Sequence, residues 1–441
     1  MPATAFQLSP YPGHMPVPTM LSRSEIDYLY WLTSTQFTGR GRIVELGCFF
    51  GGSTMPLAAG LASRPERVPN LLTYDSFIMD SDTAPRYPVG LSSGDSFRPI
   101  FNSYLKDHLP RITVREGWLP TQLQAGDSRR IYAEQEPIEI LFVDAAKLWP
   151  VHDSILRIFA THLIPDVSIL IQQDFKHHGT YWLGLHMLQL RDCFEPLHDV
   201  TGGATHSFLY KGGLEIELQA LLAREDIVHP FQAWHDVDAY WSRREATSVR
   251  LFMRLAAATH LADIGQGSEA YNLLTFFHQE LRHSGLKLPG PGEYSDVPAL
   301  QSEFIQTCRK VELTPGGESA AILRHAAEQS VPSTQPWRDA RRQAAADRCR
   351  GLNYSTIALY GAGRHTAELL KSGWPGPGIT VAAIIDDYST APHIQNIPIM
   401  RPTLLPSSIQ AIVISSEASE DALFHSAAAA SPAIPILRIY S

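Results

Sequence analysis

Hydrophobic positions along this chain follow two spacings, one typical of strands and one typical of helices. Between residues 42 and 212, short apolar runs alternate with segments of helical length. Buried runs rich in Val, Ile and Leu are typical of strands in a parallel sheet covered on both faces. The runs predicted as strands are 42–47, 71–77, 112–117, 138–145, 167–174 and 206–212. This alternation predicts a Rossmann-like, doubly wound α/β domain over residues 20–212, after an N-terminal extension at 1–19.

Residues 213–345 show the helical spacing. One apolar face comprises Leu251, Leu255, Ala258, Leu261 and Ala262, and a second comprises Ala270, Leu273, Leu274, Phe277 and Leu281. The two faces predict a packed helical hairpin within a helical linker region. This region could be a homo-oligomer interface, an acceptor-binding lid or a spacer. Trp234 and Trp241 are seven residues apart, and we predict that both belong to the core.

Residues 346–441 return to the alternation of strands and helices. The segments 355–373, 379–389 and 411–417 each contain an apolar run of strand type. They predict a second, smaller Rossmann-like α/β domain.

Composition excludes several classes of function. The formal net charge is −9 and no dense Lys/Arg run occurs, so we predict neither a nucleic-acid partner nor a membrane partner. The four cysteines are far apart and match no zinc or redox spacing. No signal peptide pattern and no apolar run of about 18 residues is present. These features together predict a cytoplasmic protein.

The stretch VELGCFFGGST, residues 44–54, marks a candidate ligand site. In a doubly wound sheet, ligands bind where a strand's carboxyl end meets the following helix. Gly47, Gly51 and Gly52 let a backbone approach a ligand closely. Glu45 precedes them, and its carboxylate would repel a pyrophosphate but attract a cationic ligand such as S-adenosylmethionine. The alternative role for Glu45 is a helix cap.

The next predicted strand ends in a second acidic residue. Asp75 lies 24 residues after Gly51, the position from which an acidic side chain commonly binds ribose hydroxyls. The alternative is that Asp75 only begins a turn. Two acidic residues on successive strands favour the cofactor interpretation.

Five stretches resemble the class I S-adenosylmethionine-dependent methyltransferases, and among them the macrocin-type sugar O-methyltransferases. They are VELGCFFGGST, YDSF, VREGWLPTQL, ILFVDAAKLW and ILIQQDF, in the order of that family, and they span residues 40–182. The resemblance implies that the methionine end of the cofactor is lined by Glu45, Gly47, Gly51, Gly52 and Ser53. It also implies that Asp75 and Ser76 bind ribose and that Gly117 and Trp118 flank adenine. Trp118 could instead pack in the core.

The same resemblance implies a divalent metal, here Mg²⁺, held by acidic residues after the fourth and fifth strands. Asp144 stands at the first position and Asp174 at the second, whereas Gln173 replaces one expected aspartate. Asp144 and Asp174 are therefore the predicted metal ligands. Lys147 places a positive charge at the same turn, where it could orient an acidic acceptor or stabilise an alkoxide.

A histidine base would serve methyl transfer to a hydroxyl without a metal. His177 and His178 follow Asp174 closely, and we predict His177, held by Asp174, as that base. The predicted catalytic set is therefore Asp144, Lys147, Asp174 and His177. Either histidine could instead lie in a solvated loop.

The C-terminal region, residues 346–441, contains the stretch YGAGRHT, in which Gly361, Gly363 and Thr366 follow a predicted strand. Asp386 lies 23 residues after Gly363. This is the dinucleotide pattern with threonine in place of the third glycine. The block resembles small nucleotide- or sugar-nucleotide-binding domains of carbohydrate-modifying enzymes, and we interpret it as a binding module.

These observations predict a methyltransferase that uses S-adenosylmethionine and modifies a small glycosyl acceptor: a sugar, glycoside or sugar nucleotide of glycan or secondary-metabolite biosynthesis. One alternative is a binding protein that keeps the methyltransferase fold without turnover. Another is a nucleotide-binding protein or nicotinamide oxidoreductase that acts through the C-terminal domain.

Overall fold

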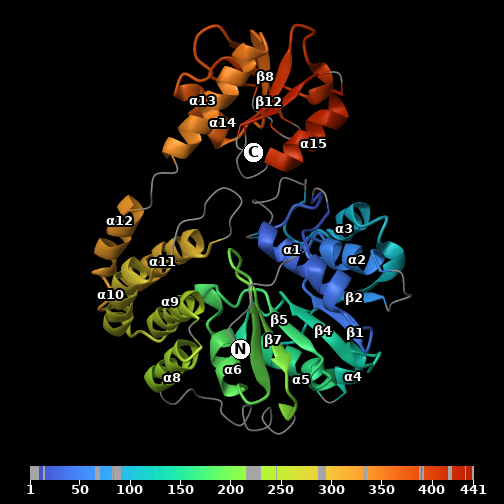
Figure 1. The fold of residues 1–441 in the computed structure, drawn as a ribbon, viewed down its shortest axis with the longest axis vertical. Coiled ribbons are helices and arrows are strands. Elements are labelled where there is room, and N and C mark those ends of the chain that lie inside the picture. The colour runs from blue at the N-terminus through green and yellow to red at the C-terminus, as the bar shows by residue number, and fades with distance from the viewer. Residues whose placement is uncertain are drawn as a thin grey trace. The chain divides into compact units, whose positions relative to one another are not determined.

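The computed structural model describes most of the chain (Figure 1). Its described residues exclude 1–8, 13–14, 65–69, 82, 84–90, 125, 215–229, 245, 287–294, 331–334, 387–388, 390–391, 416–419, 433 and 440–441. The chain forms two compact units, Met1–Gln329 and Ser330–Ser441.

The first unit is built on a seven-stranded sheet with the order β3-β2-β1-β4-β5-β7-β6. Its strands are β1 (Arg42–Leu46), β2 (Leu71–Asp75), β3 (Ile112–Glu116), β4 (Ile138–Val143), β5 (Ile169–Gln172), β6 (Phe194–Asp199) and β7 (His206–Tyr210). The first five are parallel, and β7 is antiparallel to both β5 and β6. The Rossmann-like prediction is confirmed. Strand order reverses between β1 and β4, where such sheets bind their ligands.

Helices cover both faces of this sheet (Figure 1). They are α1 (Arg23–Trp31), α2 (Thr54–Ala62), α3 (Arg98–Tyr104), α4 (Asp127–Ile131), α5 (Trp149–Ile158) and α6 (Trp182–Gln189). Side chains that alternate along a strand enter two separate cores: Leu141 and Leu170 pack with α5 and α6, and Ile140 and Ile171 pack with α1 and α2. Apolar runs without polar alternation are thus explained by burial on both faces.

The predicted helical region begins with α8 (Pro230–Ser242), α9 (Thr247–Asp263) and α10 (Gly267–His283). It continues with α11 (Val297–Glu312) and α12 (Ala320–Ser330). Helices α9 and α10 pack against each other, which confirms the predicted hairpin. Trp234 and Trp241 are both buried, as predicted. None of the described helices is long and apolar enough to cross a membrane.

A buried lysine joins this helical region to the sheet. The Lys176 ammonium, in the loop after β5, is fully buried and lies 2.7 Å from an Asp199 carboxylate oxygen and 3.0 Å from one of Asp296. It also donates to the Val200 carbonyl at 3.0 Å. Since Asp296 directly precedes α11, this ammonium fixes α11 against the loop that follows β5.

The second unit contains a six-stranded sheet with the order β10-β11-β9-β8-β12-β13. Its strands are β8 (Thr356–Tyr360), β9 (Thr380–Ile385), β10 (His393–Ile394), β11 (Ile397–Met400), β12 (Ala411–Ile414) and β13 (Ile436–Arg438). Its helices are α13 (Gln335–Gly351), α14 (Arg364–Lys371) and α15 (Glu420–Ala430). All pairs except β10–β11 are parallel, so the second α/β domain is confirmed.

Candidate active site

The glycines of the β1–α2 loop are required by contacts within the protein. Gly47 has a positive φ of 88°, and a Cβ there would lie 3.0 Å from the carbonyl carbon of Asp144. A Cβ on Gly52 would lie 2.4 Å from the Thr19 hydroxyl oxygen, and one on Gly51 would lie 3.1 Å from the Leu105 side chain. The chain before α1 therefore packs directly on this loop. Close approach to a ligand remains a prediction.

Asp75, at the end of β2, holds the same loop. One carboxylate oxygen accepts the backbone N–H groups of Cys48 and Phe49, both at 2.9 Å, and the other accepts that of Phe77 at 2.9 Å. The Ser76 hydroxyl lies 3.5 Å from the second oxygen. Asp75 thus connects the ends of β1 and β2. Its predicted contact with ribose would be made beside these bonds.

Glu45 lies beneath the loop and is fully buried. Its two carboxylate oxygens accept the hydroxyls of Ser53 at 2.6 Å and Thr54 at 2.7 Å. Burial raises the pKa of Glu45 to about 7, and the two hydroxyls oppose that shift. Glu45 therefore ties the Ser53 and Thr54 hydroxyls at the start of α2 to β1, but α2 has no side-chain capping hydrogen bond at Ser53. The predicted contact of Glu45 with the cofactor is left to experiment.

Gly117 and Trp118 follow β3 at the same edge of the sheet. The Gly117 N–H donates to the Asp75 carbonyl at 2.8 Å. The Trp118 side chain is 74% exposed, so the alternative that it packs in the core is wrong. Because β1, β2 and β3 are adjacent and parallel, their carboxyl-end loops form one edge, as a bound cofactor requires. Contact between Trp118 and adenine stays a prediction.

At the ends of β4 and β5, Lys147 joins the two predicted metal ligands. Its ammonium lies 2.6 Å from an Asp144 carboxylate oxygen and also contacts one of Asp174. The turn that carries Asp144 and Lys147 is held in place, because the Trp182 indole donates to the Ala146 carbonyl at 3.0 Å. One cation therefore bridges the ends of two adjacent strands.

The charges of this group follow from its surroundings. Burial raises the pKa of Asp144 to about 7, although the Lys147 ammonium opposes the shift. Burial by itself would lower the pKa of Lys147, but the Asp144 and Asp174 carboxylates outweigh it and raise that pKa above its ordinary value. Lys147 is thus a cation at neutral pH.

Gln173 is turned away from this group. Its buried amide donates to a Glu25 carboxylate oxygen at 3.0 Å and accepts the Thr205 hydroxyl at 2.6 Å. Its amide oxygen is therefore not directed at Asp174. With Lys147 on one oxygen of each carboxylate, Asp144, Asp174 and Gln173 do not fit a divalent cation, which needs a cage of open oxygen ligands. Among the described residues, the group whose ligand atoms lie close enough to hold an ion is His177, His178 and Glu303.

A third group combines the loop after β5 with helix α11. Glu303 of α11 accepts the backbone N–H of His178 at 2.7 Å, and the same oxygen lies 2.5 Å from His178 Nδ1. His177 stacks on His178 with ring centroids 4.7 Å apart. Its Nε2 lies 3.9 Å from the other Glu303 oxygen. Sequence analysis missed Glu303, since one acidic residue on an amphipathic helix carries no signal.

The hydrogen bonds assign a different role to each histidine. Burial by itself would raise the pKa of Glu303, but the hydrogen bonds from His178 outweigh it and hold that pKa below its ordinary value. Glu303 is therefore ionised at neutral pH, can only accept, and leaves His178 Nε2 as the basic nitrogen. His177 Nδ1 instead accepts the Gly179 N–H at 3.0 Å. The carboxylate of Asp174 binds Lys147 rather than His177, so the geometry favours His178 over the predicted His177 as a base.

The loop after β8 in the second unit repeats the arrangement around Asp75. Asp386 accepts the Ala362 N–H at 2.8 Å, and Gly361 has a positive φ of 108°. The Thr366 hydroxyl contacts the Gly361 carbonyl and lies 2.6 Å from the Ser415 hydroxyl. Gly363 directly precedes α14. Nucleotide binding by these residues remains a prediction.

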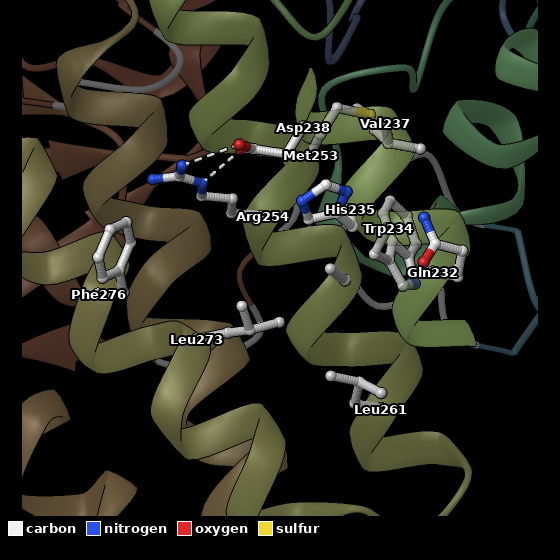
Figure 2. Close-up of a pocket in the computed structure, with 11 residues that line it drawn as sticks. Gln232, Trp234, His235, Val237, Asp238, Met253, Arg254, Leu261, Leu273 and Phe276 are labelled. Atoms are coloured by element: carbon white, nitrogen blue, oxygen red, sulfur yellow. Dashed lines mark hydrogen bonds and ion pairs between the residues drawn. The ribbon is translucent and has the colours of Figure 1, made fainter. Parts of the chain in front are cut away.

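A cavity of about 480 Å³ lies among α8, α9 and α10 (Figure 2). Its lining is largely apolar but includes Arg254 and Asp238. The Arg254 guanidinium donates to the Asp238 carboxylate at 2.7 Å. The predicted catalytic and cofactor residues are not among those that line it. The cavity is therefore separate from the candidate site.

No family model and no curated protein matches the chain. Among solved structures, the O-methyltransferase NovP is similar at 15% identity over 44% of this chain and 82% of its own, with a TM-score of 0.34. The calicheamicin methyltransferase CalS11 is 18% identical over 43% of this chain and 77% of its own, with a TM-score of 0.31. A methyltransferase from Geobacter sulfurreducens is 18% identical over 45% of this chain and 81% of its own, with a TM-score of 0.29.

These scores are too low to carry an argument about activity. The fold assignment rests on the strand order of the sheet itself.

Proposed function

We propose that the first unit is an S-adenosylmethionine-dependent methyltransferase that acts on a hydroxyl of a small glycosyl acceptor: a sugar, glycoside or sugar nucleotide. The observation that supports this most is the acidic edge of the sheet. Asp75, Asp144 and Asp174 stand at the carboxyl ends of β2, β4 and β5 around the switch point, and Glu45 lies buried beneath the loop after β1. Such an edge disfavours a pyrophosphate and suits a ligand with a sulfonium and an ammonium.

The cofactor would lie along the ends of β1, β2 and β3. The loop from Gly47 to Ser53 would receive its methionine end, Asp75 and Ser76 its ribose, and Gly117 and Trp118 its adenine. The acceptor would then lie over the ends of β4 and β5, beside Lys147 and His178. This placement puts the methyl group at the switch point.

The chemistry would be an in-line displacement. Bound S-adenosylmethionine would supply the methyl group, which would pass to the acceptor oxygen with release of S-adenosylhomocysteine. The hydroxyl proton passes to His178 Nε2, and Glu303 stabilises the imidazolium through Nδ1. Positioning of the two reactants supplies much of the rate, and proton removal by a held base adds about 10²–10⁴-fold.

Binding of S-adenosylmethionine is expected to depend on Asp75. The Asp75→Asn variant removes a charged acceptor of backbone N–H groups and loosens the loop, at a cost of about 1–3 kcal/mol, or roughly 5- to 150-fold in Kd. The matched variant is Asp386→Asn, which alters the corresponding position of the second unit and should leave the Kd unchanged. Calorimetric titration of both variants and the wild type is the measurement.

Three outcomes would count against this assignment. No binding by the wild type would contradict the methyltransferase proposal. Loss of binding only in Asp386→Asn would place the cofactor in the second unit. Equal affinity in Asp75→Asn and the wild type would exclude Asp75 from the cofactor site.

The role of Glu303 predicts an effect on rate without an effect on cofactor affinity. We expect Glu303→Gln to slow methyl transfer at least about tenfold and to shift its pH profile, because the neutral amide no longer stabilises the imidazolium. Glu303→Asp should recover part of the rate. The assay is transfer of labelled methyl groups to a panel of sugar nucleotides and glycosides.

The control for this series is Glu312→Gln on the same helix, where Glu312 pairs with Arg324 at 3.0 Å. Its rate should equal that of the wild type. A Glu303→Gln variant with full activity and an unchanged pH profile would reject the dyad.

A further inference from the structure

The bridge between Asp144, Lys147 and Asp174 occupies the place where the resemblance implies a divalent metal. Asp144 follows β4 and Asp174 follows β5, and the two strands are paired in the sheet. The Lys147 ammonium is bonded to both carboxylates. A cation is therefore already present between the two side chains predicted to hold Mg²⁺.

Electrostatics and ligand geometry both oppose a metal here. A dication entering between the two carboxylates would meet the Lys147 ammonium at close range, and like charges that close repel strongly. The amide of Gln173, which replaces one expected aspartate, is committed to Glu25 and Thr205. Mg²⁺ needs near-octahedral oxygen coordination and gives up its waters reluctantly.

We propose that the Lys147 ammonium is the built-in cation of this site, so that neither its structure nor its chemistry needs a divalent metal. Its third N–H remains for a ligand, because an ammonium carries three donors and the two carboxylates accept two of them. The side chain is 55% exposed, which leaves that donor within reach of an acceptor.

The consequence for the acceptor rests on the proposed function. The third N–H would donate to the attacking hydroxyl oxygen and stabilise the negative charge that develops there as the proton leaves. A metal can chelate two vicinal hydroxyls, whereas one N–H holds one oxygen. The acceptor of this enzyme therefore needs a single hydroxyl rather than a vicinal diol.

The test is a titration of the full-length protein with Mn²⁺. The electron paramagnetic resonance signal of the free ion measures how much Mn²⁺ is bound. The wild type is expected to show no saturable Mn²⁺ binding below about 1 mM that Asp144→Asn weakens, where 1 mM is the weak end of carboxylate sites. An ion held by His177, His178 and Glu303 would be bound equally by that variant. Lys147→Met should bind Mn²⁺ at least about tenfold more tightly, because two carboxylates are freed. The double variant Lys147→Met/Asp174→Asn should lose that gain, and Lys147→Arg should behave like the wild type.

Wild-type binding of Mn²⁺ that is weakened by Asp144→Asn would overturn the proposal. So would a Lys147→Met variant that melts at the wild-type temperature and binds no more Mn²⁺ than the wild type. The readout involves no methyl transfer. A failure of the proposed function would appear instead in the S-adenosylmethionine titration.

Discussion

Replacing the buried Lys176 with methionine is expected to lower the free energy of unfolding of the first unit by about 3–5 kcal/mol. Methionine fills the space of the lysine stem, but it leaves the Asp199 and Asp296 carboxylates without their shared cation. Asp296 is buried, and an uncompensated buried charge is far more costly than a lost surface pair. The loop that carries His177 and His178 would lose one of its connections to α11, and the bonds between Glu303 and His178 would remain.

Urea unfolding of the full-length protein checks this expectation, and Lys211→Met is the matched control. Lys211 also pairs with an aspartate, Asp166, but both side chains are exposed. That pair should therefore contribute little to stability, because solvent screens it. If the two variants lost equal stability, the buried Lys176 ammonium would not be what stabilises the packing of α11 against the loop after β5.

The protein is expected to lose stability steadily as the pH falls from about 6.5. Burial lowers the pKa of His186 to about 3 and that of His206 to about 4. Burial also lowers the pKa of His198 to about 4 and holds that of His152 well below its ordinary value. Below about pH 6.5, the unfolded chain protonates these rings while the folded protein keeps them neutral, so acid favours unfolding.

Two carboxyl groups act in the opposite direction. The pKa values of Glu45 and Asp144 are raised to about 7, so these groups take up protons in the folded state first. The four histidines outnumber them. The expected net loss is at least about 1.4 kcal/mol for each pH unit, the value for one proton of difference.

Urea unfolding at pH 7, 6 and 5 measures this slope. His206→Leu should make the loss of stability per pH unit smaller. His206 packs against the Phe175 and Trp241 rings, so protonating its ring destabilises the folded state. His235→Leu, at an exposed site, should leave the slope unchanged. Stability that stays constant or rises between pH 7 and pH 5 would contradict the assignment of these buried histidines.

The apolar spacing by itself determined the two sheets, the helical hairpin and the positions of Glu45, Asp75, Asp144 and Asp174 at strand ends. These features are predictable because a strand's apolar run is local in sequence and the carboxyl ends of parallel strands share one edge. Burial of Trp234 and Trp241 follows from the helical period in the same way.

Contacts between distant segments were decided only by the tertiary structure. Lys147 meets Asp174, Gln173 turns to Glu25, and Glu303 reaches His178 across 125 residues. No local spacing relates these partners. The first contact depends on the pairing of β4 with β5, and the other two depend on how α1 and α11 pack against the end of the sheet. The sequence thus placed acidic groups at one edge, while packing decided which of them hold the loops, which hold a histidine, and which bind an ammonium in place of a metal.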